Sequence, residues 1–238
     1  MKELRADKLA AESLGISRQD ARKLIWKGQV EVNGRLCKKI DEKFLEGSVV
    51  TAAGRQAIHQ EFIYLMLNKP RGVVSASRDP RQTTVVDLVR DAYPRRQLFP
   101  AGRLDKDSEG FVLLTDDGAF AHEILAPKHH IPKTYRVTLD TPFTEEMQAG
   151  FREGVLLADG SRTLAAEALF TQDERVCQVI LHEGMYHQIK RMFGRFGAGV
   201  ERLQRTAMGD LPLDKDLAPG EYRPLKEYEL EQIACGRS

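Results

Sequence analysis

Charge and composition change together near residue 60, and this change divides the chain into two segments. Residues 1–59 hold twelve Lys/Arg against eight Asp/Glu, whereas the remaining residues hold 24 against 27, so the local net charges are +4 and −3. The stretch TAAGRQAIHQE, residues 51–61, is rich in the small and polar residues typical of a linker. We therefore expect two domains, a small one over residues 1–59 and a larger one over residues 60–238.

The overall composition limits the partners and surroundings of the chain. Its net charge of +1 argues against a general polyanion binder but allows a local basic face. No window approaches the roughly 18 apolar residues of a membrane span, and the first residues, MKELRADK, lack the apolar core of a signal peptide. The cysteines Cys37, Cys177 and Cys235 are far apart and form no C-x-x-C pair, which argues against a disulfide framework or a zinc knuckle. We expect a reduced cytoplasmic protein without membrane contact.

The N-terminal segment has the pattern of two helices followed by a small hairpin. The first helix has an apolar side formed by Leu4, Leu9 and Leu14. Gly15 ends it, and Ser17 with Asp20 three residues later predicts the capped start of a second helix, SRQDARKLIWKG. The sequence VEVNGRLCKK then predicts a strand and a turn at Asn33-Gly34.

The second helix also carries basic residues opposite its apolar side. They recur at a spacing of four and form a stripe, namely Arg18, Arg22, Lys23 and Lys27. A charged helix face is often only solvated, and the alternative is a surface that binds nucleic-acid phosphates. The spacing by itself leaves both interpretations open.

This segment resembles the S4 RNA-binding domain. The pattern of that family is present as RADKLA, GISRQDARKLIWKGQVEVNG and EGSVV, which together cover nearly the whole of residues 1–50. The resemblance implies that the segment binds RNA and that the basic stripe contributes to the contact.

From residue 62 onward, strand and helix patterns follow one another irregularly. Strands are predicted over residues 62–70, 110–115, 133–140, 163–170, 175–182 and 200–209. Helices are predicted over residues 83–93, 117–126, 143–154 and 186–197. Because the order is not a strict β-α-β alternation, we expect an α+β fold with a largely antiparallel sheet.

The stretch GRLDKDSEGFVLLTDDG, residues 102–118, surrounds a short apolar run with carboxylates. Asp105, Asp107, Glu109 and Asp116 fall at positions 1, 3, 5 and 12 of a calcium-binding loop. However, position 12 requires a bidentate Glu, and prolines interrupt the helix that should precede the loop. The pattern therefore argues against calcium, and Asp105 is set apart because it alone adjoins both an apolar residue and a cation.

Other familiar motifs are incomplete. In HEGMYH, His182 and His187 are five residues apart and would diverge by roughly 140° on a helix, so they do not form a zinc site. The chain has no G-x-S-x-G elbow, no P-loop and no dinucleotide fingerprint. Nothing in the sequence implies a metal or another cofactor.

Four segments together resemble the pseudouridine synthases of the ribosomal small subunit synthase A type. They are LNKPRGVVSA, AGRLDKDSEGFVLLTDDG, HHIPKTYRVTL and EGMYHQIKRMFGRFG, and the tail LDKDLAPGEYRPL is typical of the same subgroup. With the S4 segment in front, the resemblance covers essentially the whole chain. It implies a mixed, mainly antiparallel central sheet with the active site in a central cleft.

The resemblance also assigns roles to individual residues. It implies that Asp105 is the catalytic carboxylate, that Tyr135 packs on the target uracil and that Lys190 pairs with Asp105. Arg103 is similar to the residue that helps displace the target base from its helix. Two further RNA contacts are expected from the basic surface beside the site, His187 and Arg191.

The chemistry of pseudouridine formation agrees with these roles. The reaction breaks the bond from uracil N1 to ribose C1′ and joins C1′ to C5. A carboxylate can attack C1′ or remove the C2′ proton, and the sequence leaves both routes open. An aromatic face can hold the base by stacking, worth about 1–3 kcal/mol, against a cost of a few kcal/mol for removing the base from its helix.

We therefore predict an enzyme that isomerises a specific uridine in small subunit (16S) ribosomal RNA, as a cytoplasmic monomer without a cofactor. Its substrate is either the free RNA or a partly assembled small subunit. One alternative is the same reaction on large subunit (23S) RNA. The other is an S4-type RNA-binding protein without catalysis, against which the joint presence of GRLD, KTY and HQIK argues.

Overall fold

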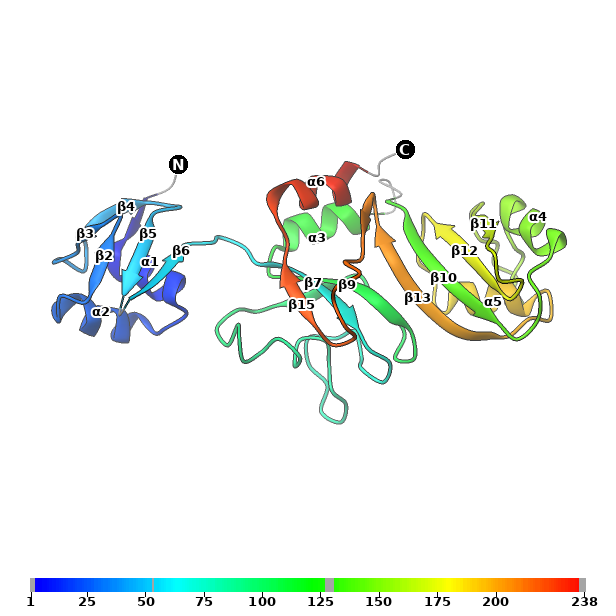
Figure 1. The fold of residues 1–238 in the computed structure, drawn as a ribbon, viewed down its shortest axis with the longest axis horizontal. Coiled ribbons are helices and arrows are strands. Elements are labelled where there is room, and N and C mark those ends of the chain that lie inside the picture. The colour runs from blue at the N-terminus through cyan, green and yellow to red at the C-terminus, as the bar shows by residue number, and fades with distance from the viewer. Residues whose placement is uncertain (1–2, 53, 127–130, 236–238) are drawn as a thin grey trace. The chain divides into compact units, whose positions relative to one another are not determined.

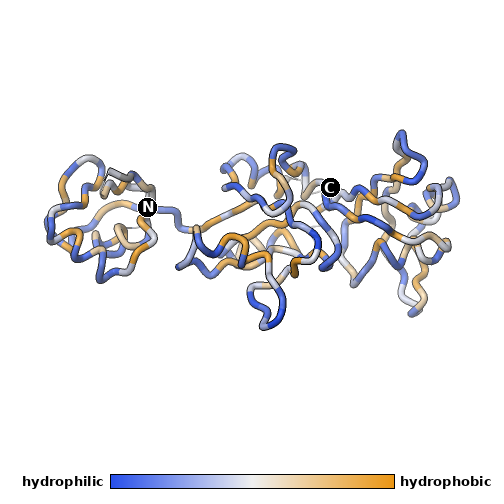
Figure 2. The backbone as a smooth tube through the Cα atoms, turned by 60° about the horizontal axis from the view of Figure 1, so that its bottom comes forward, coloured by the Kyte–Doolittle hydropathy of each residue, from blue (hydrophilic) through white to orange (hydrophobic). Residues whose placement is uncertain are grey.

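The computed structural model describes residues 3–52, 54–126 and 131–235 (Figure 1). The chain forms two compact units. One consists of Met1–Ile63 and Arg90–Gln97, and the other of Tyr64–Val89 and Leu98–Ser238. Hydrophobic stretches follow the strands and helices inside each unit, whereas the connecting loops are mostly hydrophilic (Figure 2). No helix in the described ranges has the length and apolarity needed to cross a bilayer.

The first unit combines two helices with short strands, which pair as β1 with β4 and in the order β3-β2-β5-β6. Its elements are β1 Glu3–Arg5, α1 Ala6–Leu14, α2 Arg18–Trp26, β2 Val30–Val32, β3 Arg35–Leu36, β4 Lys43–Leu45, β5 Val49–Ala52 and β6 Arg55–Ile58. The two predicted helices and the hairpin are confirmed. The prediction was wrong for Leu4, which lies in β1, because the first helix begins only at Ala6.

Local side-chain chemistry explains the element boundaries of this unit. Ser17 caps α2 by accepting a hydrogen bond from the backbone N–H of Asp20 at 3.0 Å. The turn between β2 and β3 has positive φ at both Asn33 (52°) and Gly34 (76°), which matches the twist of a two-residue hairpin. The Asn33 side chain also accepts from the N–H of Val49 at 2.8 Å, which ties the hairpin to β5.

A buried carboxylate joins the two helices. Asp7 on α1 is fully buried and accepts hydrogen bonds from Arg18 and Arg22 of α2, each at 2.8 Å. Burial alone would raise the pKa of Asp7, but the hydrogen bonds from the two arginines outweigh it and lower the pKa to about 2. Both arginines stay about half exposed. Two members of the predicted basic stripe therefore also hold α1 against α2.

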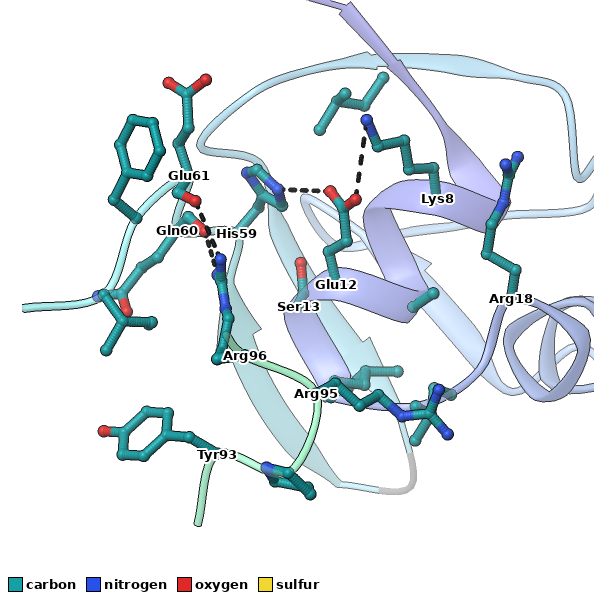
Figure 3. Close-up of a pocket in the computed structure, with 18 of the residues that line it drawn as sticks. Lys8, Glu12, Ser13, Arg18, His59, Gln60, Glu61, Tyr93, Arg95 and Arg96 are labelled. Carbon is teal, nitrogen blue, oxygen red and sulfur yellow. Dashed lines mark hydrogen bonds and ion pairs between the residues drawn. The ribbon is translucent and has the colours of Figure 1, made fainter. Parts of the chain in front are cut away.

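The segment Arg90–Gln97 is attached to the first unit through one arginine. The guanidinium of Arg96 donates to two backbone carbonyl oxygens of the linker, those of Glu61, at 2.9 Å, and Gln60 (Figure 3). Beside them, the buried ring of His59 lies with its Nε2 2.8 Å from Oε2 of Glu12 on α1. The Arg96 contacts explain why this segment belongs to the first unit, although the residues before and after it in the sequence belong to the second unit.

The second unit is built on a nine-stranded sheet of order β11-β12-β10-β13-β9-β7-β15, with β14 added to β13 and β8 to β9. Its strands are β7 Tyr64–Lys69, β8 Phe99–Ala101, β9 Glu109–Thr115, β10 Lys133–Leu139, β11 Glu167–Phe170, β12 Val176–Leu181, β13 Val200–Met208, β14 Leu211–Pro212 and β15 Tyr222–Pro224. Among the described strands, β9 and β13 pair in parallel and the other pairs are antiparallel. The predicted α+β fold with a mixed, mainly antiparallel sheet is confirmed.

Helices cover this sheet. They are α3 Gly118–Leu125, α4 Glu145–Glu153, α5 Gln188–Gly194 and α6 Glu227–Cys235. Helices α3 and α6 lie side by side (Figure 1), and their residues Ala121, Ile124 and Ile233 share one core with strand residues such as Phe111. Phe151 of α4 packs on Phe193 of α5, with ring centroids 4.7 Å apart.

Residues 83–93 do not form the helix that we predicted. They form successive turns in which the N–H of Asp87 donates to the carbonyl of Thr84 and that of Val89 to the carbonyl of Val86. The Asp87 carboxylate accepts from both the N–H and the hydroxyl of Thr84, at 2.8 and 2.9 Å. Such local bonds compete with the i→i−4 ladder of a helix. The strand predicted from residue 163 also begins later, at Glu167.

Gly110 marks a close backbone approach at the parallel junction of β9 and β13. It has φ of +98°, and a Cβ atom at this position would lie 2.2 Å from the carbonyl oxygen of Arg205. All seven residues of β9 are buried, so this strand has little room to move away. The junction therefore requires a glycine.

We expect the Asp7 interaction to make the first unit sensitive to acid. A carboxylate whose pKa is lowered on folding stabilises the fold above its unfolded pKa, and this contribution is lost as pH falls from about 4 to 2. Its size is about 2 kcal/mol. Hydrogen exchange of the α1 and α2 amides should show wild type more protected than Asp7→Asn near pH 6, and a smaller difference near pH 2. A difference that is independent of pH would contradict this account.

Gly110→Ala should destabilise the second unit by about 2–5 kcal/mol, because it combines a left-handed backbone with a steric clash against β13. Urea unfolding followed by circular dichroism measures the change. Gly118→Ala is the matched control, since Gly118 begins α3 without a positive φ and has no neighbour within 4 Å in the described structure. Equal effects of the two substitutions would contradict the role given to Gly110.

Candidate active site

The loop that carries Asp105 connects β8 to β9, and a buried serine fixes its path. The hydroxyl of Ser75 accepts from the N–H of Leu104 at 3.1 Å and donates to the carbonyl of Leu104 at 3.0 Å. Leu104 itself is buried. Since Leu104 directly precedes Asp105, these two hydrogen bonds hold the backbone on the N-terminal side of the carboxylate.

A buried lysine holds the next part of the loop. Lys69, at the end of β7, is fully buried, and its Nζ donates to the backbone carbonyls of Pro70 (3.1 Å), Lys106 (3.2 Å) and Ser108 (2.6 Å). Burial lowers the pKa of Lys69 to about 8, while the charges of Asp107 and Asp105 oppose the shift. Lys69 was not among the site residues predicted from the sequence. The available signal was a lysine directly after an apolar run and before a proline.

Two carboxylates of this loop meet the start of α5. Lys190 Nζ lies 2.7 and 2.8 Å from the two carboxylate oxygens of Asp107, and 3.7 Å from Oδ2 of Asp105. The hydrogen bond from Lys190 lowers the pKa of Asp107. His187 approaches the other oxygen of Asp105, with Nε2 3.5 Å from Oδ1. Lys190 therefore lies between the two carboxylates and is closer to Asp107 than to Asp105.

Asp107 is thus part of the site, although only Asp105 was set apart among the carboxylates of this stretch from the sequence. The other carboxylates of the acidic stretch have separate partners. Glu109 accepts from Arg202 at 2.8 Å, and Asp117 caps α3 by accepting from the N–H of Phe120 at 3.0 Å. Among the described residues, no three His, Cys, Asp or Glu side chains gather as a metal site requires.

Tyr135 lies on β10, which is separated by β13 from β9, the strand that follows the Asp105 loop. It is buried on β10 and stands in register with Arg205 of β13, which in turn pairs with Gly110 at the start of β9. Arg205 is also buried, and its Nε donates to the carbonyl of Phe111 at 2.6 Å. Within the described part of the chain, its Nη2 has no hydrogen-bond partner. Arg205 was also not among the predicted site residues.

Lys133, two residues before Tyr135, adds a second cation, which is partly buried. Its pKa is lowered to about 8, first by burial and then by the positive charge of Arg205. Lys133, Tyr135 and Arg205 share one face of the sheet, because alternate residues and cross-strand partners point the same way. The ring of Tyr135 is therefore accompanied by positive charge.

The remaining predicted RNA contacts lie outside this cluster. Arg103 is exposed, with no hydrogen bond or ion pair to any described residue. Arg191 pairs with Asp159 and donates to the carbonyl of Tyr186 at 3.4 Å. Arg18, Arg22, Lys23 and Lys27 belong to the first unit, where Lys23 lies 3.4 Å from Asp20 and Lys27 is exposed. The structure thus brings Asp105, His187 and Lys190 together.

Comparison with known proteins supplies the family. A family model described as RNA pseudouridylate synthase matches residues 63–194, and the S4 domain model matches residues 4–50. An uncharacterized RNA pseudouridine synthase of Bacillus subtilis, YtzG, is 45% identical over 97% of this chain and 98% of its own length. The ribosomal small subunit pseudouridine synthase A of Escherichia coli K12 is 39% identical, with 97% of this chain and all of that protein covered.

A solved structure agrees with the sequence matches. The crystal structure of a pseudouridylate synthase superposes with a TM-score of 0.68 at 38% identity, over 97% of this chain and 99% of that one. The synthase model matches more than half of the chain, and the relatives match nearly all of it. The chain therefore belongs to the RNA pseudouridine synthases, enzymes that isomerise uridine to pseudouridine, and it carries an S4 domain in front of its synthase domain.

Proposed function

We propose that the protein isomerises one uridine of small subunit ribosomal RNA to pseudouridine, with Asp105 as the catalytic carboxylate. The main support is the geometry of Asp105. Ser75 fixes the backbone of the preceding Leu104, the Asp105 side chain keeps 26% exposure, and Lys190 Nζ lies 3.7 Å from Asp105 Oδ2. A carboxylate that is held rigidly but remains accessible suits a group that must meet ribose C1′ or the C2′ proton.

The neighbours of Asp105 have complementary tasks in this proposal. Lys190 provides a positive charge beside both carboxylates, which stabilises their negative charge and orients them. Tyr135 offers the ring that holds the detached uracil while it turns. Arg103, exposed and unpaired among the described residues, is available to fill the gap that the displaced nucleotide leaves.

The choice of small subunit RNA rests on the relatives. Proteins named ribosomal small subunit pseudouridine synthase A, from Haemophilus influenzae and Escherichia coli, are each 39% identical to this chain over 97% of its length. The proposal keeps the expectation of a cytoplasmic monomer that needs no cofactor. The decisive experiment maps pseudouridine in ribosomal RNA from cells with and without this protein. Loss of one site in small subunit RNA supports the proposal, whereas loss in large subunit RNA contradicts it.

Asp105→Asn should lower single-turnover conversion by at least about a thousandfold, because the amide can neither attack nor accept a proton. Tritium release from RNA labelled at uridine C5 measures the rate, and binding of the RNA should change little. Asp107→Asn is the matched control, since Asp107 touches the same lysine, and it should lose much less activity. An Asp105→Asn enzyme within about tenfold of wild type would remove Asp105 from the mechanism.

The S4 domain should supply affinity through phosphate contacts. Lys27→Gln, at an exposed position of the first unit, should lower the slope of log binding constant against log salt by about 0.7–0.9. Lys215→Gln removes an exposed lysine between two aspartates and serves as the control. Titrations of labelled RNA at several salt concentrations give both slopes. Equal slopes for wild type and Lys27→Gln would exclude a phosphate contact at Lys27.

A further inference from the structure

The segment Glu183–His187, between β12 and α5, is held in place by one buried glutamine. The amide oxygen of Gln188 accepts from the N–H of Met185 at 2.9 Å, and its nitrogen donates to Oε1 of Glu183 at 2.6 Å. The same glutamate oxygen accepts from the N–H of Leu164 at 2.8 Å. Gln188 itself is buried. The segment is therefore fixed before any substrate arrives.

This fixed segment presents an aromatic ring to solvent. Tyr186 is 76% exposed, the largest exposure among the large hydrophobic residues described. Its ring lies on the ring of His187, with centroids 3.8 Å apart and planes inclined by 18°. His187 covers one face of the tyrosine ring, and the high exposure leaves the other face open. No hydrogen bond of the Tyr186 hydroxyl occurs within the described residues.

His187 connects this ring to the candidate catalytic carboxylate, because it contacts both Tyr186 and Asp105. His187 Nε2 lies 3.5 Å from Asp105 Oδ1, and the tyrosine ring follows at 3.8 Å from the histidine ring. Lys190 and Arg191 lie in the following helical turn, where each is paired with a carboxylate, and Arg191 also donates to the Tyr186 carbonyl. A nucleotide next to one held at Asp105 comes within reach of the open tyrosine face.

Such a ring suits a nucleobase. Unpaired bases in RNA are commonly recognised by stacking on aromatic side chains, while nearby cations meet the phosphates. The stacked pair of His187 and Tyr186 already has the parallel geometry that a base would extend as a third layer. His187 adopts a left-handed backbone, with φ of 48°, which non-glycine residues rarely do.

We propose that Tyr186 stacks on a nucleobase that flanks the target uridine and so contributes to the selection of the RNA sequence or conformation around it. This inference rests on the proposed function, since it takes Asp105 as the point where the target sits. Tyr186 makes no contact with the reacting atoms in this scheme. It is a residue that binds and positions the substrate.

The first test compares Tyr186→Ala with wild type in single-turnover kinetics. The value of kcat/KM should fall about 5- to 150-fold, the range that corresponds to base–aromatic stacking. The rate at saturating RNA should fall much less. Tyr186→Phe keeps the flat ring and should recover most of the loss. Tyr228→Ala, at a tyrosine of α6 that is 53% exposed, is the control and should match wild type.

The second test identifies the contacted nucleotide. Substrates with an abasic site at each position flanking the target uridine should reveal one position whose loss lowers kcat/KM for wild type. The same substrate should cause little further loss in Tyr186→Ala, because the two changes remove one contact. Additive losses at every flanking position would overturn the proposal.

A spectroscopic test avoids activity altogether. Trp26 is the single tryptophan of the chain, so Trp26→Phe combined with Tyr186→Trp places the sole tryptophan at the proposed contact. Stacking on a base should quench its fluorescence when RNA binds, and the abasic substrate should quench it less.

The outcomes separate the two proposals. If wild type converts no uridine in ribosomal RNA, the proposed function fails. If wild type is active but Tyr186→Ala equals it in kcat/KM, and the tryptophan at position 186 is not quenched, only the role of Tyr186 fails.

Discussion

The loop that presents Asp105 depends on one buried ammonium group. Lys69 loses the hydration of its Nζ and gains three backbone carbonyl oxygens, two of which belong to the loop, at Lys106 and Ser108. Burial of a charge is costly unless hydrogen bonds compensate it, and here the backbone provides them. The segments LNKPRG and GRLDKDSEG therefore form one structural unit, although the residues that touch are 37 positions apart. The two sequence motifs are thus joined in the fold by the hydrogen bonds of Lys69.

The parallel pairing of β9 and β13 adds the other parts of the site to this unit. Arg205 faces Gly110 on one side and Tyr135 on the other, so one residue of β13 aligns the start of β9 with the aromatic strand β10. Strand β12, next to β10, leads directly into the segment before α5, which delivers His187 and Lys190. Asp105 thus comes from one half of the sheet and its neighbours from the other half. The site therefore draws on strands from both halves of the sheet.

These contacts explain which features the sequence could predict. Local chemistry is readable, and the cap at Ser17, the turn at Asn33-Gly34 and most strands of the second unit were predicted correctly. The helix over residues 83–93 failed because the Thr84–Asp87 turn competes with a pattern that is apolar at the right spacing. Lys69, Asp7 and Arg205 were missed because their partners are set by tertiary structure. The family resemblance implied that Lys190 pairs with Asp105. Lys190 lies 3.7 Å from that carboxylate but only 2.7 Å from Asp107, a difference that depends on the folded loop and cannot be read from the sequence.

The hydrogen bonds from Arg18 and Arg22 to Asp7 affect the entropy that these arginines would lose on binding a phosphate. A free arginine side chain carries about 2 kcal/mol of rotamer entropy, which is lost when it settles on a phosphate. Arg18 and Arg22 are already restrained by the Asp7 carboxylate, yet remain about half exposed. Folding of the first unit has therefore ordered these two side chains in advance. A phosphate that binds them would therefore cost less side-chain rotamer entropy than one that binds two free arginines.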